Sequence, residues 1–150
     1  MPGPATRKRR GIEAEHDLAK KLWRHGFAVI RGPASGAKAK HVIYPDIVAI
    51  RKGRVLVFEV KRRTTQTTIY ISREQVVKLR EFAERAGGKA YIAVKTGNPG
   101  SWTFIRIEDL LETRNGNYKV TEELLREKGV GLKELVNMYT CKGLNEFSAG

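Results

Sequence analysis

The chain has 150 residues, 41% of them apolar and 8% aromatic, which is typical of one globular domain with a hydrophobic core. Its net charge of +13 favours nucleic acid or an anionic surface as a partner. No apolar run approaches the ~18 residues of a membrane span, and no signal-peptide pattern is found, so no membrane association is expected. Cys141 is the only cysteine, which excludes an internal disulfide and a cysteine-rich zinc site. We therefore expect an intracellular, cytoplasmic protein.

The basic residues are concentrated in the first half of the chain. Residues 1–65 hold 16 of the 29 basic residues but only 5 of the 16 acidic residues. Residues 1–9 lack apolar periodicity and are expected to form a flexible basic arm. The folded domain is then expected to span residues 10–138, followed by a flexible tail over 139–150. A solvated basic surface with no DNA partner is the alternative explanation of the charge.

The order of the expected elements indicates a mixed α/β fold with a central sheet flanked by helices. A first helix is expected from Gly11 to His25, with Gly26 as its C-terminal cap. The sequence "SREQ" at 72–75 has the form of a capping box that begins a second long helix, through about Ala86. Strands are expected at 27–31, 45–50, 55–61, 68–71, 89–95 and 102–107, a loop at 32–44, and short helices around Leu124 and Leu135.

The stretch "VLVFEVK" at 55–61 is typical of a buried strand until Glu59 and Lys61, which lie on one side of it. If Lys52 and Gly53 form a two-residue hairpin turn, Asp46 falls directly opposite Glu59. Two neighbouring carboxylates repel each other, so this end of the hairpin needs a cation. Lys61 and a bound metal are both candidates. A plain ion pair between Glu59 and Lys61 is the alternative, with Asp46 merely capping a turn.

Glu15 lies on or beside the apolar side of the first helix and is a third acid that can point toward the sheet. A surface position beside neighbouring bases is its alternative. Three acids and a lysine in a strongly basic chain indicate metal-dependent hydrolysis of a phosphodiester. Hard oxygen ligands suit Mg²⁺ or Mn²⁺.

The segments "PD" at 45–46 and "EVK" at 59–61 resemble the PD-(D/E)xK nuclease signature, which is short. With "RRGIEAEHDLAKKLWRHGFAVIRGPASG", "IYISREQVVKLREFAERAGGKAYIAVK" and "WTFIRI", the chain resembles the archaeal-type Holliday junction resolvases from about Arg9 to Ile107. A looser similarity continues at 129–136. This resemblance implies a restriction-endonuclease-like fold and a homodimeric, Mg²⁺-dependent DNA endonuclease, with Mn²⁺ as a substitute. It also implies paired, symmetric nicks in four-way DNA junctions during recombination and repair.

The resemblance assigns roles to single positions. Asp46, Glu59 and the backbone carbonyl of Val60 are implied metal ligands, and Lys61 is the implied catalytic lysine. Glu15 matches the acid of the N-terminal helix that completes the site. Ser35 matches a loop serine that approaches the scissile phosphate, although an ordinary loop serine is its alternative. Gln75 matches a position that is commonly Gln in this family, with no role assigned.

One departure concerns His16, which stands where the family often has an arginine after the helix acid. A histidine is only partly protonated at pH 7, so this change affects phosphate contacts rather than the metal site. Another nuclease of the same superfamily and a non-catalytic DNA-binding module remain alternatives to a resolvase. The residues expected to contact DNA are Arg9, Arg10, His16, Arg31, Lys38, Lys40, Arg62 and Arg63.

Overall fold

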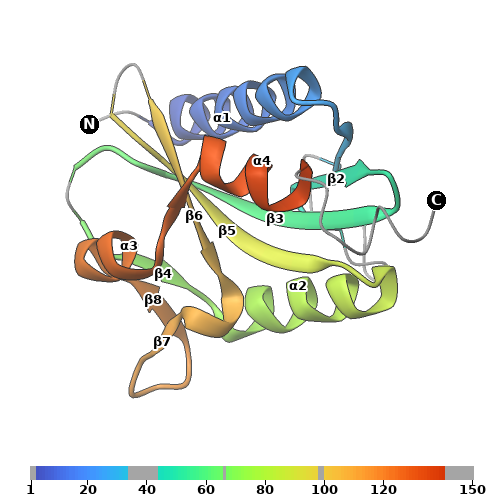
Figure 1. The fold of residues 1–150 in the computed structure, drawn as a ribbon. Coiled ribbons are helices and arrows are strands. Elements are labelled where there is room, and N and C mark those ends of the chain that lie inside the picture. Colours follow the sequence, from blue (N-terminus) through green and yellow to red (C-terminus); the bar gives the residue numbers. More distant parts are fainter. Residues whose placement is uncertain (1–2, 34–43, 66, 98–99, 141–150) are drawn as a thin grey trace.

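The computed structural model describes residues 3–33, 44–65, 67–97 and 100–140. Its centre is a six-stranded sheet with the strand order β1-β2-β3-β5-β6-β9 (Figure 1). The pair β3–β5 is parallel and the other neighbours are antiparallel, which confirms the expected mixed sheet. The strands are β1 (Ala28–Arg31), β2 (Ile47–Arg51), β3 (Arg54–Arg63), β5 (Lys89–Thr96), β6 (Ser101–Arg106) and β9 (Val130–Gly131).

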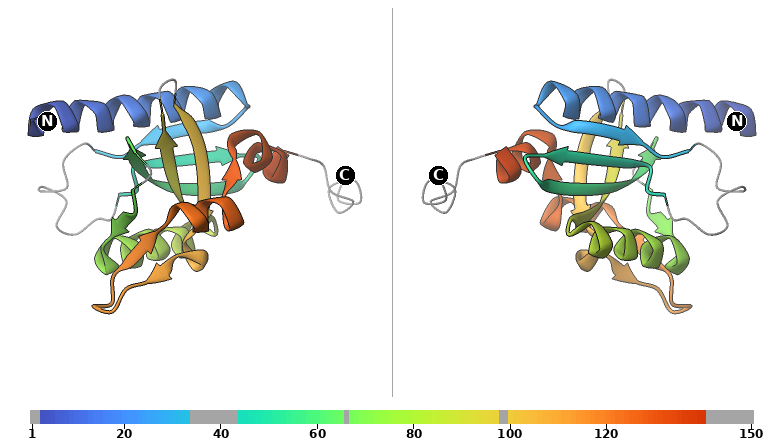
Figure 2. Two further views of the ribbon diagram at one scale, coloured as in Figure 1. Left: turned by 90° about the vertical axis from the view of Figure 1, so that its left-hand side faces the viewer. Right: turned by 90° about the vertical axis from the view of Figure 1, so that its right-hand side faces the viewer.

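Helices cover both faces of this sheet (Figures 1 and 2). Because strand side chains alternate, Leu56 and Phe58 pack in the hydrophobic cluster of α1 and α4, whereas Val57 packs in that of α2 and α3. No helix in the described part of the chain is both long and apolar enough to cross a membrane. The helices are α1 (Pro4–Arg24), α2 (Arg73–Ala86), α3 (Glu122–Lys128) and α4 (Leu132–Thr140), and a 3₁₀ turn spans Ile107–Asp109.

A small second sheet lies beside the start of α2. It consists of β4 (Ile69–Ile71), β8 (Tyr118–Val120) and β7 (Leu111–Glu112), in that order. The expected strand at 68–71 and the expected helices around Leu124 and Leu135 are confirmed. Strands β7 and β9 were not expected, because two residues are too few to show an alternating pattern, and the three-residue β8 was not expected either.

The hairpin of β2 and β3 has the predicted two-residue turn. Lys52 has a φ of 48° and Gly53 a φ of 82°, the paired left-handed conformation of the tightest hairpin turns. Glycine adopts this conformation freely, whereas Lys52 does so at some cost. Arg51 therefore pairs with Arg54, and Ile47 pairs with Phe58. This register brings Asp46, which directly precedes β2, next to Glu59 of β3.

Helix α1 begins earlier than the sequence indicated. Its first residue is Pro4 rather than Gly11, so residues 4–9 are helical where an arm without regular structure was expected. Proline favours the first turn because its φ is preset and its missing N–H has no helical partner there. The following Ala, Arg and Lys residues are strong helix formers that need no apolar stripe. Helix α4 likewise continues to Thr140, into the expected tail.

Helix α2 has the predicted capping box at its start. The Ser72 side chain accepts a hydrogen bond from the Gln75 backbone N–H, and the Gln75 side chain accepts one from the Ser72 backbone N–H. Both donors would otherwise lack a partner. The helix ends at Gly87, which has a φ of 68°. Val76, Leu79 and Ala83 on its buried side fix α2 against the sheet.

Candidate active site

The hairpin register places Asp46 and Glu59 side by side. Asp46 immediately precedes β2, and one Asp46 oxygen, Oδ2, accepts a hydrogen bond of 2.8 Å from the backbone N–H of Val60. This contact extends the strand pairing one step past Ile47 and Phe58. The Glu59 side chain is only 19% exposed. Two carboxyl groups are thus held together at a largely buried position.

Burial and mutual repulsion disturb both acids. Burial, followed by the negative charge of Asp46, raises the pKa of Glu59 to about 7. Burial also raises the pKa of Asp46, although the hydrogen bond from Val60 and the charge of Lys61 act in the opposite direction. Two carboxyl groups this close repel each other when both are ionised. Without a cation, ionisation of both acids is therefore disfavoured.

Glu15 extends this acidic site from helix α1. Its side chain is 17% exposed, and burial, followed by the charge of Asp46, raises its pKa to about 6. Arg31, at the end of β1, opposes that rise, with its Nη2 at 3.9 Å from Glu15 Oε1. The Nη1 of Arg31 lies 3.1 Å from the Nε2 of His16. Because Arg31 can only donate, His16 accepts in this contact through an unprotonated nitrogen.

Lys61 and Gln75 both contact the carboxylate of Glu59. The Nζ of Lys61 lies 3.7 Å from Glu59 Oε1. The Nε2 of Gln75, on the first turn of α2, donates to the same oxygen at 3.3 Å. The simple Glu59–Lys61 ion pair is therefore present, but it leaves Asp46 and Glu15 without full compensation. Sequence reasoning missed the contact of Gln75, whose only local signal is its place in the capping box.

The donor chemistry fits a hard divalent cation, because carboxylate oxygens converge where their charges repel. In the described residues, however, no three His, Cys, Asp or Glu side chains are grouped closely enough to hold a metal ion. Metal ligation here would therefore require the acidic side chains to move closer together.

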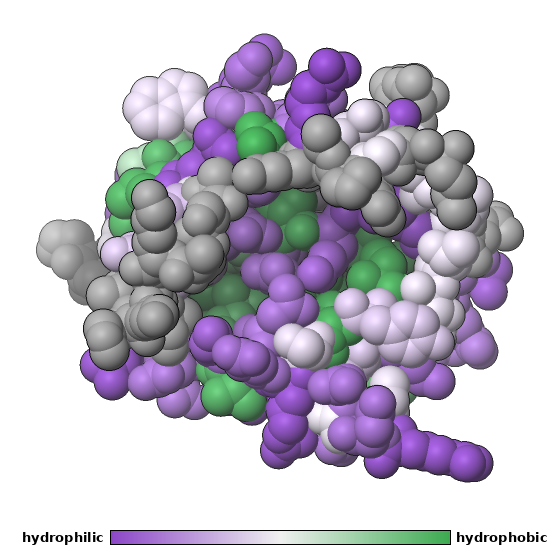
Figure 3. Space-filling model, turned by 180° about the vertical axis from the view of Figure 1, so that it is seen from behind, coloured by the Kyte–Doolittle hydropathy of each residue, from purple (hydrophilic) through white to green (hydrophobic). Residues whose placement is uncertain are grey.

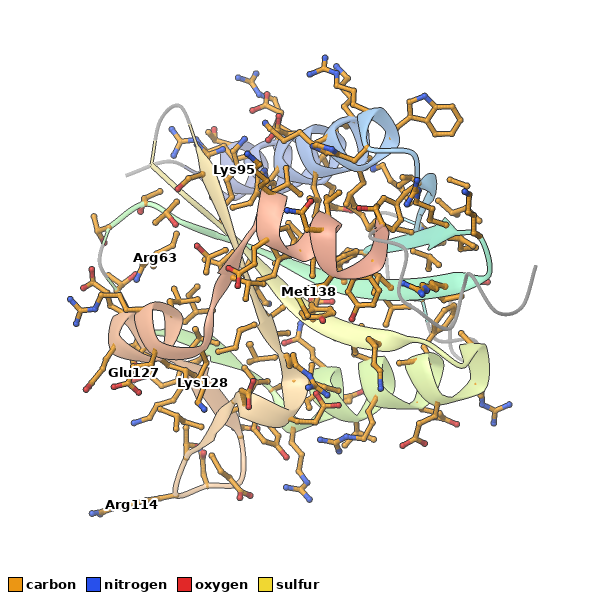
Figure 4. All side chains as sticks on the ribbon, in the orientation of Figure 1. Arg63, Lys95, Arg114, Glu127, Lys128 and Met138 are labelled. Atoms are coloured by element: carbon orange, nitrogen blue, oxygen red, sulfur yellow. The ribbon has the colours of Figure 1, made fainter. Side chains whose placement is uncertain are left out.

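The expected DNA-contacting residues differ in their surroundings. Arg9 and Arg62 are exposed, and Arg10 is half-buried. Arg63 is only 8% exposed (Figure 4). Seen from behind, the surface is hollowed near its centre, with hydrophilic side chains between apolar ones (Figure 3). Ser35, Lys38 and Lys40 lie outside the described residues.

The acids at the end of this hairpin, with a lysine two positions along the same strand, keep the spacing of the PD-(D/E)xK signature. The model of the archaeal Holliday junction resolvase (Hjc) family matches residues 6–144. The Sulfurisphaera tokodaii crossover junction endodeoxyribonuclease Hjc is 41% identical over 137 residues, covering 91% of this chain and 92% of the relative. The Methanocaldococcus jannaschii enzyme of the same name is 40% identical over 116 residues, covering 77% and 79%.

A solved structure agrees with these sequence relatives. The solved structure of Hjc from Archaeoglobus fulgidus, a Holliday junction resolvase, superposes with a TM-score of 0.75 at 34% identity. The match covers 84% of this chain and 99% of the other. This chain therefore belongs to the archaeal Holliday junction resolvase family, a family of DNA endonucleases.

Proposed function

We propose that this chain resolves four-way DNA junctions by two symmetric, Mg²⁺-dependent nicks, with Mn²⁺ able to replace Mg²⁺. The observation that carries the proposal is the largely buried pair of Asp46 and Glu59, with Lys61 beside it, in a chain of this family and of net charge +13. Such a pair is a poor structural element because its charges repel, but it is suited to a cation that neutralises both.

Asp46, Glu59 and the carbonyl of Val60 are the proposed ligands, with Glu15 completing the site. The backbone N–H of Val60 points at Asp46. In an extended strand the N–H and C=O of one residue project to the same edge, so the Val60 carbonyl faces the Asp46 side as well. Strand β2 has not yet begun there, so no strand partner competes for that carbonyl. These features support the assignment.

A bound divalent cation supplies a water of lowered pKa and neutralises charge on the reacting phosphate. Lys61 is the group of this chain that would contact that phosphate or orient the water, because its ammonium lies 3.7 Å from Glu59 Oε1 and its side chain is 25% exposed. Ser35 is proposed to approach the same phosphate from the loop between β1 and β2.

The DNA backbone is proposed to follow the basic residues around this site, among them Arg9, Arg10, His16 and Arg31. Arg63 has the most unusual surroundings. Its Nε and Nη1 are buried and have no hydrogen-bond partner in the described part of the chain. A buried guanidinium without an anion is costly, so a phosphate is the natural partner. Arg63 follows Lys61 by two strand positions, roughly 7 Å along the same face, which suits a neighbouring phosphate of one DNA strand. Lys38, Lys40 and Arg62 complete the proposed DNA-contacting set.

Two symmetric nicks require two active sites, so a homodimer with two-fold symmetry is proposed as the acting form. Its recognition of DNA would depend on branched shape and on phosphates rather than on base sequence. Binding should therefore weaken steeply as salt is added. An intracellular site of action, in the cytoplasm where DNA is available, is part of the same proposal.

The test is cleavage of a labelled four-way junction beside a linear duplex of the same sequence, each with Mg²⁺ and with EDTA. Paired nicks in the junction alone, lost in EDTA and in Asp46→Asn, are expected. Equal cutting of junction and duplex would instead identify a nuclease of the same superfamily with another substrate. Tight binding with no cutting in any divalent metal would identify a DNA-binding module and overturn the proposal.

A further inference from the structure

Gln75 has no role in the function proposed above, yet its side chain connects a helix cap to the candidate active site. Its Oε1 accepts a hydrogen bond of 3.2 Å from the backbone N–H of Ser72, which is a donor only. The orientation of the amide is therefore fixed by this contact, and its Nε2 must face the other way. There it donates to Glu59 Oε1 at 3.3 Å.

The N-terminal end of α2, from which the Gln75 side chain extends, is held in place by contacts with other elements. The backbone N–H of Arg73 donates to Asn117 Oδ1 at 2.9 Å, and Arg73 Nη1 contacts Glu112 Oε1 at 3.4 Å. These contacts fasten the start of α2 to the small sheet. On the far side, Val76 is fully buried against the central sheet. Gln75 therefore extends from a fixed helix end rather than from a mobile loop.

The chemistry of the amide suits the task of holding a metal ligand. Glu59 Oε1 accepts a hydrogen bond from Gln75 Nε2 and forms an ion pair with Lys61 Nζ, and of the two only the hydrogen bond is directional. A neutral donor does this without adding a cation that would compete with a metal, whereas a carboxylate at the same place would repel Glu59. Partners that orient ligating carboxylates in this way change metal affinity when they are removed.

We infer that Gln75 is a positioning residue, which holds the carboxylate of Glu59 in the orientation that binds the divalent metal. This inference rests on the proposed function, because it assumes that Glu59 is a metal ligand. Gln75 does not touch DNA in this role. Its loss should weaken metal binding while leaving the affinity for a junction unchanged.

The experiment compares Gln75→Met with Ser72→Ala in the full chain. Methionine matches the length of glutamine but cannot donate, and Ser72→Ala removes half of the cap while keeping the Gln75 amide. Calorimetric titration with Mn²⁺ in the absence of DNA measures metal binding, and thermal unfolding measures the cost to the helix. Junction binding is measured in EDTA. We expect Mn²⁺ affinity to fall roughly 10- to 100-fold in Gln75→Met and to stay within about twofold of wild type in Ser72→Ala.

Both variants should lose a similar, small amount of stability, about 1 kcal/mol, because each damages the cap. Equal losses of Mn²⁺ affinity would overturn the inference, since the helix end rather than the amide donor would then be responsible. Unchanged Mn²⁺ affinity in Gln75→Met would overturn it too. Failure of the proposed function gives a different result: wild type would bind Mn²⁺ but leave junctions uncut, or Asp46→Asn would bind Mn²⁺ as tightly as wild type.

Discussion

Asp17 and Glu15 stand two residues apart on α1, yet their carboxyl groups have opposite surroundings. Asp17 accepts hydrogen bonds from Lys21 Nζ at 2.7 Å and from Trp102 Nε1 at 2.9 Å, and Lys95 Nζ lies 3.3 Å away. Burial alone would raise the pKa of Asp17, but these donors outweigh it and hold the pKa at about 2. This acid joins α1 to the hairpin of β5 and β6 and is fully compensated within the chain.

Glu15, Asp46 and Glu59 are compensated only in part by their neighbours. Burial and their mutual repulsion raise the pKa of Glu15 to about 6 and that of Glu59 to about 7. Lys21 and Lys95 both pair with the single carboxylate of Asp17, whereas Arg31 and Lys61 are shared among three acids. This difference in compensation distinguishes an acid that stabilises the fold from acids whose charges need an added cation. Substitutions at the two places should therefore have opposite effects on activity and stability.

The largest expected effect follows from Asp46→Asn. It removes a proposed ligand, so we expect junction cleavage to fall at least ~10³-fold, the loss of several kcal/mol of transition-state stabilisation. Junction binding should stay intact or become tighter, because a negative charge facing DNA is lost. Stability without metal should not fall, since repulsion with Glu59 is relieved. Gel-based cleavage, binding in EDTA and thermal unfolding measure the three quantities; cleavage at the normal rate would refute the site assignment.

Asp17→Asn is the matched change at the compensated acid, and its effects should be reversed. Lys95 is 16% exposed and would lose its carboxylate partner, as would Lys21. We expect the free energy of unfolding at pH 7 to fall by up to about 2 kcal/mol. Cleavage at a temperature where the variant is folded should change less than about threefold. A variant as stable as wild type would show that the contacts of Asp17 contribute nothing net to the fold.

The pH dependence of stability should also separate the two places. Because the pKa values of Glu15 and Glu59 are raised from 4.5 to about 6 and 7, the folded chain holds protons that the unfolded chain releases. That stabilisation is complete below about pH 4.5 and is lost as the pH rises through about 7. For Asp17 the stabilisation is complete above about pH 3.8 and is lost as the pH falls through about 2.

Metal-free wild type should accordingly lose a few degrees of Tm between pH 5 and pH 8. Mg²⁺ or Mn²⁺ should restore more at pH 8 than at pH 5, because protons compete with the metal at the lower pH. In Asp46→Asn both trends should be weaker, whereas Asp17→Asn should retain them. Parallel Tm curves for wild type and Asp46→Asn would show that the acid pair does not control this pH range.

Local patterns in the sequence predicted much of the geometry around the acids. The turn at Lys52 and Gly53 set the register that joins Asp46 to Glu59, and the "SREQ" segment set the start of α2. Both depend on residues close together in the chain, where backbone conformation and capping leave a signature. The beginning of α1 was misplaced because helix propensity without an apolar stripe leaves a weaker pattern.

Contacts between distant segments were beyond local reasoning. The Gln75–Glu59 hydrogen bond joins residues 16 positions apart on different elements, and Trp102 reaches Asp17 across 85 positions. Their formation depends on how α2, α1 and the β5–β6 hairpin pack on the sheet. The burial of Arg63 is of the same kind, since its sequence neighbours, Arg62 and Thr64, are both exposed. A run of basic residues predicts contact with DNA but not which guanidinium is enclosed.

The smallest expected effect compares these neighbouring arginines. Arg63→Met removes a guanidinium whose Nε and Nη1 are buried without a partner in the described residues, so stability should stay equal or rise by up to ~1 kcal/mol. If Arg63 holds a phosphate, junction affinity should fall about tenfold, roughly 1.4 kcal/mol, and the salt dependence should decrease by about one counterion. Arg62→Met, at an exposed position, removes the same charge and should weaken binding less, with no change in stability. A destabilised Arg63→Met variant with unchanged junction affinity would show that Arg63, like Asp17, stabilises the fold and does not bind DNA.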